Sequence, residues 1–227
     1  MKLTYYGHSC IMAEHGGVRV IIDPFLSGNP AVDVVPGDIR ADAVILTHGH
    51  DDHFGDALEI ARNNDCPVIA VHELALHCAF KGVGSHGMNL GGAFSFEGFS
   101  VKLVPALHSN SVRDGETLLY AGVSAGVLLT MGGLTFYHLG DTALFSDLEL
   151  VGRLHRIDAA AVPIGGNYTM GPDEGVLAAQ WIKPGLAIPV HYNTFSAIMQ
   201  DGEAFARNCE ENGIPCRVLD IGESLEL

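Results

Sequence analysis

Four apolar segments of this chain each lead into a histidine or an aspartate within a few residues. The segments and the residues after them are 43–46 with His48, 101–106 with His108, 134–138 with Asp141, and 186–190 with His191. Short apolar runs of this kind are typical of buried strands. Because functional side chains gather on loops that a rigid scaffold positions, we expect these strand ends to converge on one edge of the fold.

The composition favours a sheet-rich fold with many tight turns. The 227 residues are 48% hydrophobic and only 17% charged, and they include 28 glycines and 10 prolines. These values suit short strands better than a helical bundle. No linker, low-complexity tract or abrupt change in charge divides the chain. We therefore expect residues 1–227 to form a single domain.

Hydrophobic patterning predicts two similar halves, each with strands and helices. The predicted strands are residues 3–6, 10–13, 18–22, 43–46, 67–71, 101–106, 125–130, 134–138, 159–162 and 186–190. The predicted helices are residues 57–62, 73–80, 142–151 and 172–182. Gly132 and Gly133 predict a hairpin turn. The fold class that follows is α/β of the α+β type, with two mixed β-sheets packed face to face and helices on the outer faces.

Charge and targeting signals exclude several classes of partner. The balance of 12 Lys+Arg against 27 Asp+Glu gives a net charge of -15, which repels a nucleic-acid backbone, so extended nucleic acid is not an expected partner. The sequence has no signal-peptide pattern and no apolar run of about 20 residues, so we expect a cytoplasmic protein without membrane contact. The five cysteines include no CxxC pair, which argues against a thiolate zinc site. The acidic, glycine-rich surface is compatible with a homo-oligomer.

The run from Thr47 to His53, with the sequence THGHDDH, is the strongest local signal for chemistry. His48 and His50 stand two apart in extended chain, so both imidazoles can face one metal ion. Asp52 and His53 fall where the chain turns into the next helix and can reach a second position, as in two-metal hydrolases. The alternative is a polar loop that is rich in histidine by chance. Imidazole and carboxylate ligands suit zinc, with manganese or iron as alternatives.

Further motifs connect this run with a known family. Together with Gly140-Asp141-Thr142 and Pro189-Val190-His191, the order of candidate ligands resembles the metallo-β-lactamase superfamily. Residues 6–10, 22–25, 167–172 and 191–195 are similar to those of a mostly uncharacterised group of bacterial and archaeal metal-dependent hydrolases. That group is itself similar to the ascorbate-6-phosphate lactonases. The resemblance implies a four-layer αββα sandwich with a two-metal site between its sheets.

The resemblance also implies a role for individual residues. It places His48, His50 and His108 on one metal ion, Asp52, His53 and His191 on the second, and Asp141 between the two. His8 and Asp52 are the candidate catalytic residues, with His8 expected to contact the substrate or a leaving group. Asp23 is expected to accept a hydrogen bond from a ligand imidazole. Asn167, Thr169 and Tyr192 are candidates for substrate binding, although such residues also stabilise turns and helix ends.

The expected activity is hydrolysis by a water that two divalent ions activate. Two such ions make the site locally positive even in an acidic chain, so a small anionic ester, lactone, thioester or phosphoester is the expected substrate. One alternative is a phosphodiesterase acting on cyclic nucleotides or short oligonucleotides. A second alternative, of another class, is a metal-binding scaffold protein without turnover.

Overall fold

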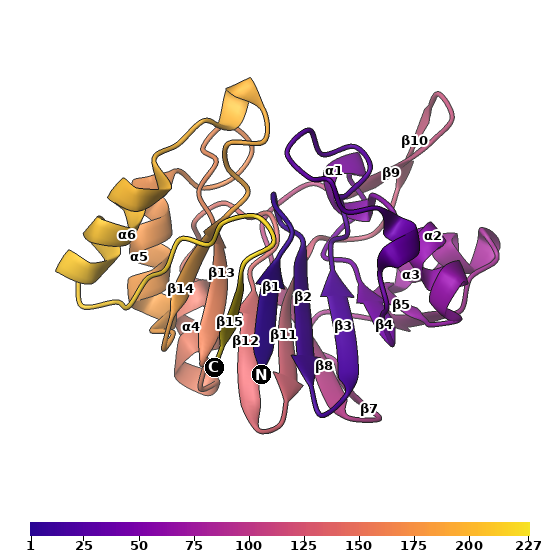
Figure 1. The fold of residues 1–227 in the computed structure, drawn as a ribbon, viewed down its shortest axis with the longest axis horizontal. Helices are drawn as coiled ribbons and strands as arrows, with labels where there is room; N and C mark the ends of the chain where they lie inside the picture. The colour runs from indigo at the N-terminus through magenta and orange to yellow at the C-terminus, as the bar shows by residue number, and fades with distance from the viewer.

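The computed structural model describes residues 1–227. Two β-sheets lie face to face between two groups of helices (Figure 1). The strand order of the first sheet is β15 (Ser224–Glu226), β1 (Lys2–Tyr5), β2 (Ile11–His15), β3 (Val18–Ile22), β4 (Ala43–Ile45), β5 (Val68–Val71), β6 (Ser85–Met88). The strand order of the second sheet is β14 (Ala187–Val190), β13 (Ala159–Pro163), β12 (Leu134–His138), β11 (Ala125–Met131), β8 (Phe99–Pro105), β7 (Ala93–Phe96).

Both sheets are mixed, and together they confirm the predicted fold class. In the first sheet, β15 to β3 pair antiparallel and β3 to β6 pair parallel. In the second sheet, β7 to β12 pair antiparallel, whereas β12, β13 and β14 pair parallel. The predicted hairpin between β11 and β12 is present, with Gly132 and Gly133 both at positive φ.

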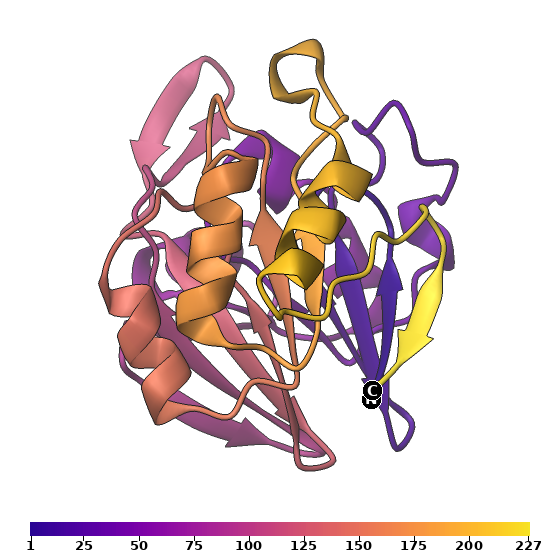
Figure 2. The ribbon, with the colours of Figure 1, turned by 90° about the vertical axis from the view of Figure 1, so that its left-hand side faces the viewer.

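Helices flank the two sheets. In the first sheet, the helices α1 (Asp51–Phe54) and α2 (Ala57–Asn64) connect β4 to β5, and α3 (His72–Phe80) connects β5 to β6. The helices α4 (Asp147–Leu154), α5 (Pro172–Ile182) and α6 (Gly202–Glu211) lie in front of the second sheet in Figure 2. Two short 3-10 turns, Pro36–Asp38 and Ser196–Ile198, lie in the loops. None of these helices combines the length and the apolar character that crossing a membrane requires.

The central strands of the second sheet are buried on both faces, and their side chains alternate between two hydrophobic clusters. In β11, Val127 and Leu129 join a cluster of 46 buried residues that also includes first-sheet residues. The side chain of Leu128 joins a separate cluster of 19 residues that includes residues of α4, α5 and α6. Because successive side chains of a strand point to opposite faces, this alternation explains the nearly continuous apolar sequence of these strands.

One predicted helix is wrong in its position. The expected helix at residues 142–151 begins only at Asp147 and continues to Leu154. The backbone before it bonds to other loops: Ala143 N donates to Leu107 O at 3.0 Å, and Met170 N donates to Thr142 O at 3.1 Å. The backbone groups of Thr142 and Ala143 therefore form hydrogen bonds with other loops, and the hydrogen bonds of the helix start after them.

Several elements were not predicted from the sequence. The largest is a separate two-stranded hairpin, β9 (Ser111–Asp114) and β10 (Thr117–Tyr120), which projects from the same edge as the loops after β4 and β14 (Figure 1). Strands β6, β7 and β15 and helices α1 and α6 were also missed. The hairpin is mostly exposed, with Leu118 and Tyr120 among the exposed large apolar side chains.

Candidate metal centre

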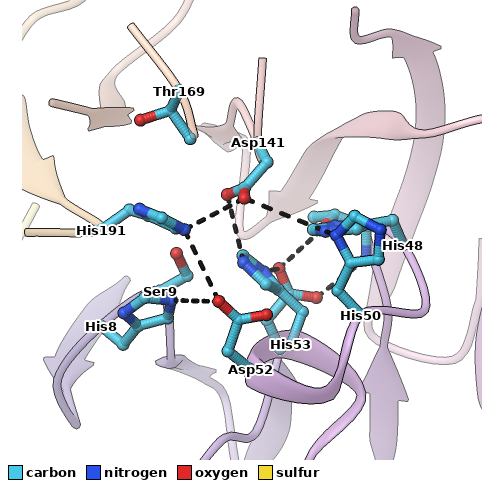
Figure 3. Close-up of polar contacts among 12 residues, drawn as sticks. His8, Ser9, His48, His50, Asp52, His53, Asp141, Thr169 and His191 are labelled. Carbon is cyan, nitrogen blue, oxygen red and sulfur yellow. Dashed lines mark hydrogen bonds and ion pairs between the residues drawn. The ribbon is translucent and has the colours of Figure 1, made fainter. Parts of the chain in front are cut away.

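Loops from both sheets bring histidines and aspartates together at one edge of the molecule (Figure 3). The contributing loops follow β4, β8, β12 and β14, which supply His48, His108, Asp141 and His191 in that order. His50 lies immediately before α1, and Asp52 and His53 lie within it. Residues that are far apart in the sequence thus meet where the strands end.

One group consists of three imidazoles. In this group His48 Nε2 lies 3.0 Å from His50 Nδ1, and His108 Nε2 lies 3.3 Å from the same atom. Ring nitrogens at these separations repel one another unless a proton or a cation lies between their lone pairs. These three side chains can therefore hold a cation together, as the resemblance implies.

A second group contains His8, Asp52, His53 and His191, whose nearest ligand atoms all lie within 4.8 Å of one another. Asp52 Oδ2 lies 3.2 Å from His8 Nε2 and 3.9 Å from His191 Nε2. The group includes the three residues expected for the second metal and adds His8. It lies beside the first group, because the rings of His48 and His53 are 4.2 Å apart.

Asp141 lies between the two groups. Its Oδ2 atom is 3.0 Å from His191 Nε2 and 3.5 Å from His108 Nε2, and its Oδ1 atom is 3.1 Å from His53 Nε2. The carboxylate is only 3% exposed. A single buried carboxylate thus contacts imidazoles of both groups, which is the position that a bridging ligand would occupy.

Asp23 supports one histidine of each group. Its Oδ2 atom accepts from His53 Nδ1 at 2.7 Å and from Thr47 Oγ1 at 2.6 Å. Since Thr47 Oγ1 gives its hydrogen to Asp23, it can accept one from His48 Nδ1, which is 3.0 Å away. Both imidazoles therefore turn the opposite ring nitrogen, Nε2, toward the centre. Partners of this kind fix the orientation and tautomer of histidine ligands.

The buried groups of the site strongly perturb one another. Burial lowers the pKa of His48 well below its usual value. Burial also acts to lower the pKa of His53, but the carboxylates of Asp141 and Asp23 outweigh it and raise that pKa well above its usual value. Burial acts to raise the pKa of Asp141, yet His53 and His191 hold it well below its usual value. The carboxylates thus create a negative field that favours positive charge at this point.

Several buried polar atoms at the centre have no hydrogen-bond partner. They are His53 Nε2, Asp141 Oδ1 and His191 Nε2. Buried polar atoms are rarely left unpaired, since the desolvation cost is large. The close approach of Asp141 to His53 and His191 lacks hydrogen-bond geometry, as expected if the atoms face a shared cation. The donor set and its unpaired atoms therefore fit divalent metal ions.

Backbone strain is concentrated around the same cluster. His8, Asp23 and His191 all have positive φ, at 53°, 47° and 55°. Each such residue costs on the order of 1–3 kcal/mol and persists only where surrounding structure holds it. A hydrogen bond of 2.7 Å from His191 N to His8 O ties two of these positions together across the two sheets. The backbone here is held in a costly conformation that aims the side chains inward.

The three candidate substrate-binding residues lie in different environments. Thr169 is 8% exposed, is drawn beside Asp141 in Figure 3, and donates its hydroxyl to Met170 O at 3.2 Å. Asn167 is exposed. The ring of Tyr192 is half-buried and packs against Gly202 at the start of α6. Substrate binding stays a prediction for all three, and packing against α6 is the contact that the structure gives Tyr192.

Sequence reasoning assigned no role to two residues that shape the site. Thr194 Oγ1 lies 2.9 Å from His8 Nδ1, and its segment, residues 191–195, is one of those that carry the family resemblance. Asn110 accepts from Gly49 N at 2.9 Å and donates to Ala121 O at 2.8 Å. It therefore joins the metal-motif loop, residues 47–53, to the base of the β9–β10 hairpin. Its proximity to His108 was the one available signal.

Comparisons with known proteins decide the family. Residues 2–191 match the family described as the Beta-lactamase superfamily domain. The chain is 48% identical over 228 residues to a UPF0173 metal-dependent hydrolase of Anoxybacillus flavithermus, covering 100% of both chains. It is also 48% identical over 229 residues to the UPF0173 metal-dependent hydrolase YtkL of Bacillus subtilis, again over 100% of both. The chain belongs to the UPF0173 metal-dependent hydrolases of the metallo-β-lactamase superfamily.

Solved structures support this assignment. The chain is similar to Igni18, a metallo hydrolase from the archaeon Ignicoccus hospitalis, with a TM-score of 0.90 and 35% identity over 100% of this chain and 98% of that one. An isothiocyanate hydrolase from Delia radicum gut bacteria has a TM-score of 0.78 at 18% identity, covering 100% of this chain and 99% of that one. The second likeness shows the shared fold alone. The protein is a metal-dependent hydrolase.

Proposed function

We propose that this hydrolase holds two divalent metal ions and hydrolyses a small anionic ester, lactone, thioester or phosphoester. His48, His50 and His108 would hold one ion, and Asp52, His53 and His191 would hold the other, with Asp141 shared between them. Zinc is the proposed metal, and manganese and iron are the alternatives.

The position of Asp141 carries the two-metal proposal. Its two carboxylate oxygens approach His191 and His53 at 3.0 and 3.1 Å and His108 at 3.5 Å. If an ion occupied only the three-histidine group, the buried His53 Nε2 and His191 Nε2 atoms would keep no hydrogen-bond partner. Sharing one carboxylate between two ions provides a partner for each group.

The chain's own residues provide orientation and exclude water from the base of the site. When bound, divalent ions would lower the pKa of a water molecule toward about 7 and polarise the oxygen of the bond to be broken. Asp23 fixes the rings of His53 and, through Thr47, of His48. His48 and His53 are fully buried, whereas Asp52 and His108 retain exposed surface. Substrate therefore approaches from the side of Asp52 and His108.

Charge favours an anionic substrate. Two divalent ions bring about four positive charges, whereas the carboxylates at the centre, Asp52, Asp141 and Asp23, bring about three negative ones. The loaded site is then net positive within a chain whose overall charge is -15. The lactone is included because the sequence motifs resemble a group of hydrolases that is itself expected to be similar to the ascorbate-6-phosphate lactonases.

The test joins metal analysis with a substrate panel. Purified protein is analysed for metal content and assayed with lactones, thioesters, phosphomonoesters and phosphodiesters. We expect about two metal ions per chain and hydrolysis within this panel. In His48→Ala and Asp141→Ala, bound metal falls and hydrolysis is lost while the circular dichroism spectrum is retained, because the side chains come from loops.

His155→Ala is the matched control, since His155 ends α4 away from the cluster. This variant keeps the metal content and activity of the parent protein. Full activity in both His48→Ala and Asp141→Ala would overturn the assignment, and activity on phosphodiesters alone would favour the nucleotide alternative.

A further inference from the structure

We propose that His8 is an additional protein ligand in the Asp52, His53 and His191 group, so that four side chains besides Asp141 serve the second metal ion. The inference rests on the proposed two-metal function. It implies that the two metal positions have different numbers of protein ligands. It also replaces the expectation that His8 contacts the substrate or a leaving group.

The ring of His8 is placed among the other ligand atoms. Its Nε2 atom lies 3.2 Å from Asp52 Oδ2, and its ring centroid lies 4.2 Å from that of His191. The side chain of His8 is fully buried, whereas that of Asp52 is 28% exposed. The imidazole is therefore on the protein side of Asp52, behind the surface that a substrate would reach.

The other ring nitrogen of His8 already has a partner. His8 Nδ1 lies 2.9 Å from Thr194 Oγ1, and that hydroxyl lies 3.5 Å from Tyr192 O. In the arrangement where Nδ1 donates to Thr194, the Nε2 lone pair faces the lone pairs of Asp52 at 3.2 Å. Two acceptors at this distance need a cation between them. An outward hydrogen bond with an inward lone pair is the usual arrangement of a histidine ligand.

The surroundings of His8 hold this orientation. The rings of Phe25 and Phe195 lie edge-on to the imidazole, each with a centroid separation of 5.6 Å. The carbonyl of His8 accepts from His191 N at 2.7 Å and from Tyr5 Oη at 3.2 Å, which stabilises a backbone with φ of 53°. A residue in the left-handed region that is fixed from several sides is typical of a functional position.

The two metal positions would then differ in openness. His48, His50 and His108 supply three side chains, which leaves room for water or substrate, as in catalytic metal sites. The other group supplies four side chains and shares Asp141, so the protein itself fills more of that position. We therefore assign the more exposed three-histidine position as the one that substrate reaches.

Cobalt(II) titration of metal-free protein tests this inference with a readout other than activity. Visible absorption reports the coordination of each equivalent, and NMR counts the exchangeable, paramagnetically shifted imidazole N–H signals of the ligands. His8→Gln keeps a side-chain N–H that can reach Asp52 but removes the imidazole. His8→Asn is the second variant, because asparagine tolerates a positive φ well. Thr194→Val removes only the outer hydrogen bond.

If His8 is a ligand, both His8 variants weaken one of two cobalt equivalents by more than the roughly 10–100-fold that loss of an outer partner costs. The N–H signal count falls by one, and the spectrum of that equivalent changes. Thr194→Val weakens the same equivalent less and keeps the signal count. If His8→Gln binds both equivalents with parental affinity and spectrum, His8 only orients Asp52 and the inference is wrong. If the parent protein binds fewer than two equivalents, the two-metal proposal itself fails.

Discussion

Asp23 connects the two halves of the candidate metal centre through a single buried carboxylate. It accepts from Thr47 N at 2.8 Å, from Thr47 Oγ1 at 2.6 Å and from His53 Nδ1 at 2.7 Å, and it is 0% exposed. Through Thr47 it also orients His48. One residue that contacts neither candidate metal position directly therefore controls a histidine in each.

This arrangement predicts the effect of Asp23→Asn. An amide cannot accept all three hydrogen bonds and places its own N–H groups against donors, so we expect the free energy of unfolding of the metal-free protein to fall by about 1–3 kcal/mol. Metal affinity at each of the two proposed positions should fall by roughly 10–100-fold. Urea denaturation and metal titration measure the two effects.

Asp42→Asn is the matched control, because Asp42 accepts from the backbone of Arg19 at 2.7 Å at an exposed position away from the site. It should leave both metal affinities unchanged. A loss of only one metal equivalent in Asp23→Asn would show that Thr47 holds His48 without help from Asp23.

The sequence could indicate some of the long-range contacts in the site but not others. Asp23 ends a predicted strand and falls within a motif, so a contact with a ligand histidine was expectable from the residue type. The contact of Thr194 with His8 spans 186 positions. Nothing local marks such a pair, because the hydrogen bond exists only after the two sheets pack together.

At the scale of elements, the β9–β10 hairpin packs directly over the metal-motif loop. A Cβ atom on Gly49 would meet Val112 Cγ2 at 2.5 Å and Ser111 O at 2.9 Å, so only glycine fits between His48 and His50. Arg113 Nε also pairs with Asp51 Oδ2 at 2.9 Å across this contact. The hairpin therefore restrains the loop that carries four of the candidate ligands.

Gly49→Ala should push the metal-motif loop and the β9–β10 hairpin apart. Because the added methyl group meets backbone as well as a side chain, the loop or the hairpin must move, and we expect metal affinity and activity to fall by at least about tenfold. Gly37→Ala is the control, since a Cβ atom there has nothing within 4 Å. Parental metal binding in Gly49→Ala would mean that the hairpin yields without disturbing the loop.

The elements differ in how well the sequence predicted them, for physical reasons. Strands such as β4 and β13 are buried on both faces, so their continuous apolar runs were easy to recognise. The β9–β10 hairpin is largely exposed and has no such run, although a glycine-first pair, here Gly115-Glu116, is a common two-residue hairpin turn that could have revealed it. The early start expected for α4 was wrong because the backbone of Thr142 and Ala143 forms hydrogen bonds with residues that are distant in the sequence.

At the scale of the whole molecule, the cluster joins two sheets that otherwise meet mainly through apolar side chains. Metal binding to the folded state should therefore stabilise the entire chain. By mass action the gain is about 2.7 kcal/mol per site when free metal exceeds its dissociation constant by about 100-fold. For a domain of this size each kcal/mol raises Tm by about 2–4 °C.

Calorimetry of chelator-stripped and metal-loaded protein tests this expectation and the single-domain prediction together. One cooperative transition that moves to higher temperature with metal is the expected result. Two transitions, of which only one responds to metal, would contradict a single domain. The general fold was predictable at this scale because burial, alternation and turn residues all favoured two packed sheets.

The hydrogen bond between His191 N and His8 O also bears on how the protein is made. His8 is synthesised long before His191, and Asp141 lies between them in order of synthesis. A nascent chain presents His48, His50 and His53 long before the residues that complete the cluster exist. The centre can therefore be complete only once His191 has been made, and metal binding to the full set of candidate ligands follows that step.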